Sequence, residues 1–278
     1  MRLGSALLDG RPTPVAQGED GSYRRLSTTS TVNALIAAGP HALAEIARAD
    51  IAEPQLLAPL APGKVVAIGL NYQDHIRETG MEAPGLPLVF AKLPSSVIGP
   101  GAAIEIDPLI TQQVDWEGEL AVVIGQRLRH ACTQEALAGV FGYTIGNDIS
   151  ARDVQFADSQ WVRAKSMDTF CPLGPLIVTA DELGDPQDLA LQTRVNGELV
   201  QSASTAEMIF GVAELLSFCS HNFTLEPGDV LLTGTPWGCG AFMSPPRYLA
   251  AGDVVEIEIA GIGLLSNPVR LSSRPARD

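Results

Sequence analysis

The chain has 278 residues, of which 46% are hydrophobic and 18% are charged, so it can bury a sizeable core and is not expected to be disordered. Its formal net charge of −14 argues against nucleic acid and an anionic membrane surface as partners, because phosphate binding needs a basic surface. No apolar run approaches the ~20 residues that span a bilayer, and the N-terminus lacks a signal-peptide core. The four cysteines are widely spaced and form no CxxC pair, which predicts free thiols in a soluble cytoplasmic protein.

Residues 1–58 are expected to form a small N-terminal domain, and residues 59–278 a larger catalytic domain. The first begins with short strand-like pieces that are broken at GRPTP and GEDG. An Ala-rich stretch from about Thr31 to Arg48 predicts a helix. The Pro-rich segment EPQLLAPLAPG is interpreted as the connector to the larger domain.

From Lys64 onward, turn signals alternate with apolar, strand-like runs: KVVAIGL, PLVFAK, AIEI, ELAVVIG, GYTIG, GPLIVTA, DVLLTG and DVVEIEI. The segment LALQTRVNGELVQS predicts a hairpin with Asn196-Gly197 as its tight turn. Helical spacing in MIFGVAELLSFCS places these residues near one face: Ile209, Val212, Leu215, Leu216 and Cys219. Because strands and helices do not alternate regularly, we expect an α+β fold that is predominantly β.

Two carboxylates enter the strand-like run of VDWEGELAVVIG. Glu117 and Glu119 are two residues apart, so in a strand they point to the same face. The run continues with apolar residues on both faces, and a buried carboxylate pair needs a cation or strong partners; an exposed polar strand face is the alternative. Asp148 in GYTIGNDISARDVQ would complete an all-oxygen set that suits Mg²⁺ or Mn²⁺. Alternatively, Asp148 caps a helix that begins at Ile149 or Ser150.

A histidine and a carboxylate are paired in GLNYQDHIRETG. His75 and Glu78 are three residues apart on a short predicted helix, so their side chains can meet. A carboxylate beside a histidine fixes its tautomer and raises its basicity, which is how a water molecule is activated. The same spacing also occurs by chance on exposed helices. The flanking Gly69 and Gly80 make the segment a candidate lid.

Two further segments carry candidate polar groups. Lys165 in WVRAKSMDTFCPLGP could bind an anionic substrate or stabilise an enolate, or it could be a surface lysine. Arg152 and Asp153 could form a surface ion pair. In EPGDVLLTGTPWGCG a strand runs into a Gly-rich turn, where a threonine hydroxyl (Thr233 or Thr235) and backbone N–H groups could meet a carboxylate. The remaining histidines are interpreted as structural: His41, His130 and His221.

In this order the motifs resemble the fumarylacetoacetate hydrolase family, particularly its bacterial 2-oxo-acid branch. The matching blocks are GLNYQDHIRETG, LVFAKLPSSVIGP, DWEGELAVVIG, GYTIGNDISARDVQ, KSMDTFCPLGP, RVNGELVQSASTAEMIF, LEPGDVLLTGTPWGCG and the tail PPRYLAAGDVVEIEIAGIGLLSNPV. The resemblance implies a mixed β-sheet roll with short helices, a small N-terminal domain and a homodimer.

The resemblance also assigns roles to particular positions. It implies a divalent metal, Mg²⁺ or Mn²⁺, held by Glu117, Glu119 and Asp148. It implies that His75, Glu78 and Lys165 are catalytic. The positions that match substrate-facing residues are Arg152, Gln155 and Thr235, with Lys92 of the FAKLPSS block as a further candidate.

One turn departs from the pattern of the family. The usual TGTPxGVG is here TGTPWGCG, which introduces Trp237 and Cys239. We expect Trp237 near the mouth of the pocket, where a large side chain would narrow the pocket or stack on substrate.

The implied site predicts hydrolytic C–C cleavage of a small anionic 2,4-dioxo acid of the acylpyruvate, fumarylpyruvate or fumarylacetoacetate type. The metal would stabilise the enolate, the His75–Glu78 pair would activate water and Lys165 would hold negative charge. The same enolate also allows 2-oxo-acid decarboxylation of the oxaloacetate type, hydration or isomerisation, and the presence of the His75–Glu78 pair favours hydrolysis. A more distant alternative is an inactive protein that only binds metal and 2-oxo acid.

Overall fold

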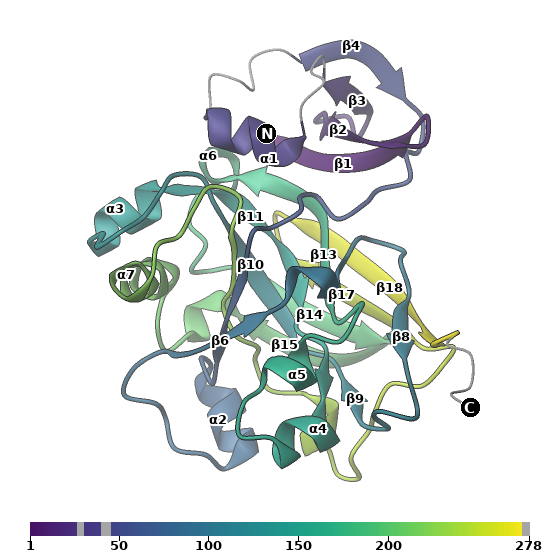
Figure 1. The fold of residues 1–278 in the computed structure, drawn as a ribbon, viewed down its shortest axis with the longest axis vertical. Coiled ribbons are helices and arrows are strands. Elements are labelled where there is room, and N and C mark those ends of the chain that lie inside the picture. Colours follow the sequence, from purple (N-terminus) through teal and green to yellow (C-terminus); the bar gives the residue numbers. More distant parts are fainter. Residues whose placement is uncertain (27–30, 40–45, 274–278) are drawn as a thin grey trace.

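The structure, a computed structural model, describes residues 1–26, 31–39 and 46–273. Strands dominate it, which confirms the predicted α+β, predominantly β fold (Figure 1). Its helices are short: α1 (Val32–Ala38), α2 (Gln73–Thr79), α3 (Thr133–Ala138), α4 (Arg152–Ala157), α5 (Val162–Lys165), α6 (Ala180–Leu183) and α7 (Val212–Asn222). Within the described ranges, no helix is long and apolar enough to cross a membrane.

Within the described ranges, eleven strands join in one large mixed sheet. Their order is β4 (Ile46–Ile51), β3 (Tyr23–Leu26), β2 (Arg11–Gln17), β1 (Arg2–Leu8), β13 (Cys171–Thr179), β11 (Val140–Asn147), β10 (Gly118–Ile124), β16 (Val230–Leu232), β5 (Val65–Gly69) and β6 (Leu88–Lys92), with β7 (Val97–Ile98) pairing beside β13. A second sheet has the order β15 (Glu198–Ser204), β14 (Ala190–Val195), β17 (Val254–Ile259), β18 (Gly263–Leu271) and β8 (Ile104–Ile106). A small third sheet pairs β9 (Val114–Asp115) with β12 (Ser150–Ala151).

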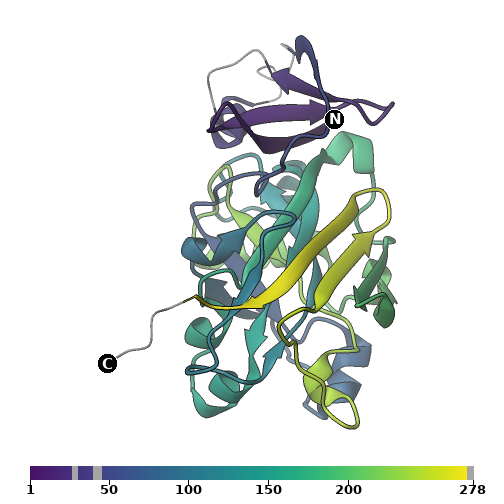
Figure 2. The same ribbon diagram turned by 90° about the vertical axis from the view of Figure 1, so that its right-hand side faces the viewer.

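The central strand β10 is buried on both of its faces. Leu120 and Val122 point into the main core, which also contains Ile257 of β17 and Leu265 of β18. Figure 2 shows β17 and β18 lying across the strands of the large sheet. The alternate residues of β10, such as Val123, pack on the other side in a cluster that includes residues of α1. This double burial explains why the strand reads as a continuous apolar run.

The N-terminal strands form a layer at one end of the molecule (Figures 1 and 2). They are continuous with the large sheet, because β1 pairs with β13 in the register Leu3↔Ile177. The helix predicted over residues 31–48 is too long: α1 ends at Ala38, and residues 46–51 form β4, while residues 40–45 lie outside the described ranges. Gly39 ends the helix with a positive φ of 81°. A proline follows it in the sequence, and a proline disfavours helical backbone in the residue before it. The division into domains at residues 58 and 59 stays a prediction.

Two local predictions have clear outcomes. The hairpin of β14 and β15 turns at Asn196-Gly197, where both residues have positive φ. Helix α7 buries Val212, Leu215, Leu216 and Cys219 as expected, whereas Ile209 precedes the helix and is not part of its face. The helix begins at Val212, three residues after Ile209, and Glu214 accepts a hydrogen bond from the backbone N–H of the N-cap residue Gly211.

We predict that Leu120→Ala destabilises the protein by about 2–5 kcal/mol, because it leaves a cavity between the two sheets next to the site described below. Chemical denaturation should show a lower midpoint with an unchanged slope. Leu199→Ala in β15 is the control, because this leucine is 48% exposed and its removal should change stability by less than about 0.5 kcal/mol. Equal effects of the two changes would contradict the proposed core.

Candidate active site

The register of β10 and β11 brings three carboxylates together. Gly118 lies opposite Asn147, so both strands reach the same edge at these residues. The backbone N–H of Asp148 donates to the carbonyl of Glu117 at 2.9 Å. One carboxylate oxygen from each of Glu117, Glu119 and Asp148 lies within 4.8 Å of the others, and all three side chains are buried.

Helix capping by Asp148 is ruled out by the structure. Helix α4 begins only at Arg152, its N-cap is Ala151, and no side chain caps it. The carboxylate of Asp148 instead accepts from Lys92 Nζ at 2.5 Å and from Lys165 Nζ at 2.8 Å. Asp148 is therefore committed to a buried charge network.

Three buried cations surround the carboxylates. Lys165 Nζ lies 2.7 Å from Glu117 Oε2 and 2.8 Å from Asp148 Oδ2, so it bridges the two carboxylates. The lysine is 2% exposed, so the surface-lysine alternative is wrong. Lys92 Nζ donates to Asp148 and also to the carbonyls of Ile149 and Lys165. Arg152 Nη2 lies 2.7 Å from Glu117 Oε1. Arg152 thus belongs to the site and forms no surface ion pair with its neighbour.

The pKa values of Glu117 and Glu119 are shifted in opposite directions. Burial opposes ionisation of Glu117, but Lys165 and Arg152 outweigh it and lower the pKa of Glu117 to about 2. Burial, reinforced by the charges of Asp148 and Glu117, raises the pKa of Glu119 well above its ordinary value. Glu119 accepts one backbone hydrogen bond, from Gly234 N–H at 2.8 Å. A cation among the three carboxylates would remove the repulsion, and an all-oxygen donor set fits a hard divalent ion.

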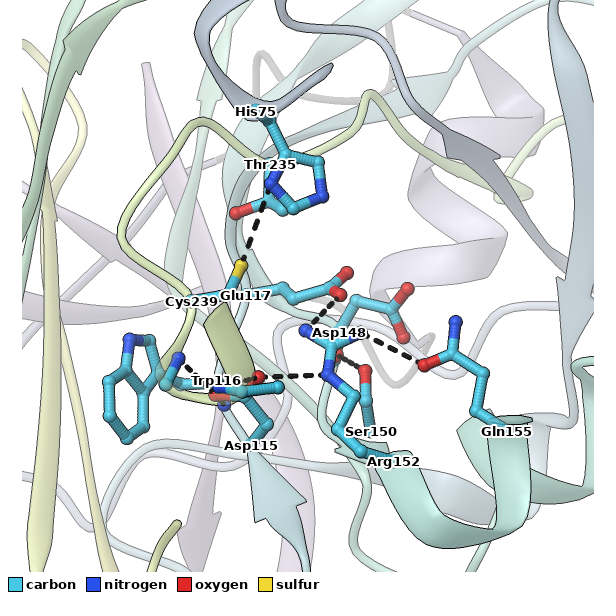
Figure 3. A network of polar contacts seen from close by, with 12 residues as sticks. His75, Asp115, Trp116, Glu117, Asp148, Ser150, Arg152, Gln155, Thr235 and Cys239 are labelled. Atoms are coloured by element: carbon cyan, nitrogen blue, oxygen red, sulfur yellow. Dashed lines mark hydrogen bonds and ion pairs between the residues drawn. The ribbon is translucent and has the colours of Figure 1, made fainter. Parts of the chain in front are cut away.

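Arg152 is held by a residue that the sequence reading missed. Its Nε donates to Asp115 Oδ2 at 2.8 Å, and its Nη1 donates to Gln155 Oε1 at 2.9 Å (Figure 3). Asp115 also accepts from the backbone N–H of Gly240 at 2.7 Å. The pairing Ser150↔Asp115 between β12 and β9 brings these segments together. The one available signal was the position of Asp115 in the same acidic block as Glu117.

The predicted histidine–carboxylate pair forms on α2. His75 Nδ1 lies 2.9 Å from Glu78 Oε2, and Glu78 Oε1 accepts from Gly238 N–H at 2.8 Å. Among the described residues, His75 Nε2 has no protein partner, and the histidine side chain lines a pocket. Cys239 Sγ lies 4.0 Å from His75 Nδ1 (Figure 3).

The Gly-rich turn anchors the carboxylates of the protein itself. Gly234 and Gly238 have φ values of 96° and 98°, a region that glycine adopts readily, and their N–H groups bind Glu119 and Glu78. The predicted contact between backbone N–H groups of this turn and a carboxylate is therefore present, but the carboxylates belong to the protein and not to a substrate. Both threonine hydroxyls also donate to backbone carbonyls, Thr233 to that of Leu120 and Thr235 to that of Gly118. Of the two threonines, Thr235 lines the pocket.

A pocket of about 260 Å³ is lined by His75 of the histidine–carboxylate pair and by Glu117 of the three carboxylates. Its polar lining residues are His75, Thr79, Glu117, Arg152, Gln155, Lys165 and Thr235. Its apolar lining includes Phe90, Phe156, Trp161 and Phe242. The volume lies below the usual range for drug-sized ligands, so the pocket suits a small metabolite.

Two residues expected at the pocket are absent from its lining. Trp237 is 47% exposed, so the expected narrowing of the pocket by this side chain does not occur; aromatic bulk is supplied by Trp161 and Phe242 instead. Lys92 is 1% exposed, and its ammonium group donates to three protein oxygens. An ammonium has three N–H donors, so Lys92 has none left for substrate.

Fold and site together define a fumarylacetoacetate hydrolase-type enzyme, and the chain belongs to this family. The family profile described as "Fumarylacetoacetate (FAA) hydrolase C-terminal" matches residues 64–270. The chain is 48% identical to the mitochondrial oxaloacetate tautomerase fahd2 of Xenopus laevis over 77% of this chain and 68% of that protein. It is 46% identical to oxaloacetate tautomerase YisK of Bacillus subtilis (strain 168), over 79% of this chain and 74% of that protein.

Two solved structures show the same fold over nearly the whole chain. Fumarylacetoacetate hydrolase from Exiguobacterium antarcticum superposes with a TM-score of 0.90 at 42% identity, covering 98% of this chain and all of that one. 5-Carboxymethyl-2-hydroxymuconate delta-isomerase from Mycobacterium smegmatis gives a TM-score of 0.83 at 38% identity, again over 98% of this chain and 100% of that one. The family resemblance read from the sequence is thereby confirmed.

We predict that Glu119→Gln abolishes stabilisation of the protein by divalent cations. Wild-type protein should gain about 2.7 kcal/mol at a free ion concentration one hundred times the dissociation constant, and the variant far less. Without metal, the variant should be at least as stable as wild type, because the glutamate has a raised pKa and its ionisation costs stability at neutral pH. Thermal unfolding with and without Mg²⁺ or Mn²⁺ measures both effects.

The control is Glu258→Gln, which removes an exposed carboxylate from β17. It should leave the metal-dependent shift unchanged. A full shift in Glu119→Gln would show that the ion binds elsewhere.

Proposed function

We propose that the protein is a divalent-metal-dependent enzyme that interconverts the keto and enol forms of oxaloacetate-type 2-oxo acids. The main support is that His75 lines a small pocket and its Nε2 has no partner among the described residues. The same pocket is lined by Glu117 of the buried carboxylate group. Relatives over 45% identical are named oxaloacetate tautomerases, and a structural neighbour is named an isomerase. These names support proton transfer more than the hydrolysis expected from the sequence.

The local charge supports a dianionic substrate only when a cation is bound. Four carboxylates, those of Asp115, Glu117, Glu119 and Asp148, face three permanent cations, those of Lys92, Lys165 and Arg152. A divalent ion turns this negative balance positive. Held by Glu117, Glu119 and Asp148, Mg²⁺ or Mn²⁺ would supply the positive charge that stabilises an enolate.

The pocket residues have donors left for substrate oxygens. Lys165 uses two of its three N–H groups on Glu117 and Asp148, which leaves one donor, and Arg152 likewise has N–H groups beyond its three protein contacts. Both side chains line the pocket, so we propose that they bind substrate carboxylate or enolate oxygens. Gln155 and Thr235 are proposed to orient the substrate. Lys92 is proposed to position Asp148 and not to contact substrate.

Proton transfer is assigned to His75. Its Nε2 would remove a proton from the carbon beside the 2-oxo group, or return one to that carbon in the reverse direction. Glu78, bonded to Nδ1, would stabilise the imidazolium that forms when Nε2 takes the proton. Glu78 is in turn fixed by Gly238 N–H, which keeps the pair aligned.

Hydrolysis of 2,4-dioxo acids is the second candidate. The 2.9 Å contact between His75 and Glu78 also suits activation of a water molecule, and a structural neighbour is named fumarylacetoacetate hydrolase. The two reactions separate on a substrate panel that follows enol absorbance and products for oxaloacetate, acylpyruvates and fumarylpyruvate. Tautomerisation predicts rapid equilibration of oxaloacetate enol with no cleavage products. Rapid acylpyruvate cleavage without oxaloacetate tautomerisation would favour the hydrolase.

We predict that His75→Ala lowers the tautomerisation rate by roughly 10²–10⁴-fold, the usual contribution of a positioned general base. Affinity for Mg²⁺ should barely change, because the histidine belongs to a separate group of residues from the three carboxylates. Stopped-flow absorbance and calorimetric titration measure the two quantities. The control is His221→Ala, an exposed histidine on α7 that should leave both unchanged. Near-full activity of His75→Ala would exclude it as the base.

We further propose that the chain forms a homodimer, on the strength of the family resemblance. Light scattering at micromolar concentration should give twice the chain mass of 29.3 kDa. A monomer at the concentration used for activity assays would contradict this proposal.

A further inference from the structure

A second group of potential metal ligands lies around the other nitrogen of His75. His75 Nδ1, a Glu78 carboxylate oxygen and Cys239 Sγ lie within 4.8 Å of one another. This group shares no residue with Glu117, Glu119 and Asp148. It differs in chemistry too, because it offers nitrogen and sulfur besides oxygen, a combination that suits Zn²⁺ and softer ions and not Mg²⁺.

The thiol of Cys239 has no close polar partner. Its sulfur is fully buried, and its polar contacts to His75 Nδ1, Gln201 Nε2 and Pro236 O are all at 4.0 Å, the outer limit for sulfur. In Figure 3 the sulfur points directly toward the imidazole of His75. A buried sulfur and a carboxylate oxygen thus approach the same imidazole nitrogen, which brings three potential ligand atoms together.

The separations are close to those that a tetrahedral ion requires. Zinc bonds of about 2.0–2.3 Å place neighbouring ligand atoms roughly 3.5 Å apart. Here Nδ1 lies 2.9 Å from the carboxylate and 4.0 Å from the sulfur, so each contact must change by only about half an ångström. The Glu78 side chain is 14% exposed, so solvent reaches one member of the group.

We propose that His75, Glu78 and Cys239 form an inhibitory site for a thiophilic divalent cation such as Zn²⁺ or Cd²⁺. Binding forms bonds from the ion to Nδ1, the carboxylate and the thiolate. The thiol proton is released to solvent, and the proton that Nδ1 shared with Glu78 moves to Nε2. The ion replaces the hydrogen bond between His75 and Glu78 and leaves a positive charge beside the imidazole, so Nε2 can no longer accept a proton. Binding itself stands on the geometry alone, whereas inhibition rests on the proposed role of His75.

The test uses the full chain saturated with Mg²⁺, which keeps the carboxylate cluster occupied. Titration with Cd²⁺ should produce a thiolate-to-metal charge-transfer absorption, and competition with a chromophoric chelator should show one tightly held Zn²⁺. Tautomerisation should fall in parallel with Zn²⁺ occupancy and recover when Zn²⁺ is chelated while Mg²⁺ is retained.

Cys239→Val is the decisive variant, because valine fills a similar volume and offers no ligand. It should keep the Mg²⁺-dependent activity, lose the Cd²⁺ absorption and resist Zn²⁺. Cys132→Ser is the matched control, since it removes an exposed thiol far from His75 in sequence and should behave as wild type. If Cys239→Val fails to fold, Glu78→Gln serves as the second variant and should weaken Cd²⁺ binding while the absorption from Cys239 persists at high ion concentration.

Three results have distinct meanings. Equal Zn²⁺ binding and inhibition in wild type and Cys239→Val would overturn the site. A Cd²⁺ absorption that disappears in Cys132→Ser would overturn it as well. Zn²⁺ binding that depends on Cys239 but leaves tautomerisation unchanged would support the site and contradict the proposed role of His75.

Discussion

Mutual neutralisation of buried charges at the adjoining ends of β10 and β11 is the constraint on which the rest of the structure depends. Removing a carboxylate or an ammonium group from water is costly, and most members of this cluster are tolerated because an opposite charge lies in direct contact. Glu119 forms no ion pair within the described residues, and burial raises its pKa instead. Lys165 bridges two carboxylates, and Arg152 joins Glu117 to Asp115. Loss of one partner would leave a buried charge uncompensated, at a cost of about 3–5 kcal/mol.

Packing and backbone hydrogen bonds around the cluster restrict the positions of its side chains. Strand β10 is fixed by apolar packing on both faces, so the acidic residues at its start cannot move toward solvent without disturbing two cores. The Gly-rich turn after β16 reaches over the cluster and binds Glu119 and Glu78 through backbone N–H groups. One short turn therefore couples the carboxylate cluster to the histidine pair on α2. Glu117, a proposed metal ligand, and His75, the proposed base, both line a single small pocket.

How much could be predicted from the sequence depends on whether the contacts are local. The strands after Lys64, the hairpin at Asn196-Gly197 and the pair on α2 follow from patterns within a few residues, and the structure contains them. The end of α1 was misjudged, although Gly39 and the following proline carried a local signal.

Contacts between segments that are distant in the sequence could not be predicted from local sequence patterns. The contact of Arg152 with Asp115 depends on the pairing of β9 with β12, and the proximity of Cys239 to His75 depends on the path of the turn. Lys92 was assigned to substrate by family position, but only the structure shows that its three donors are already taken by protein oxygens. Neither composition nor spacing reports such long-range register, because it is set by how the two sheets pack.

The site is proposed to move a proton at the carbon beside a 2-oxo group. This proposal is tested most directly by following deuterium entry at that carbon of oxaloacetate in D₂O by NMR, with Mg²⁺ present and the uncatalysed exchange subtracted. We expect metal-dependent, enzyme-catalysed exchange that is faster than any loss of carbon dioxide. Exchange no faster than the uncatalysed reaction, alongside rapid cleavage or decarboxylation of a 2-oxo acid, would contradict it.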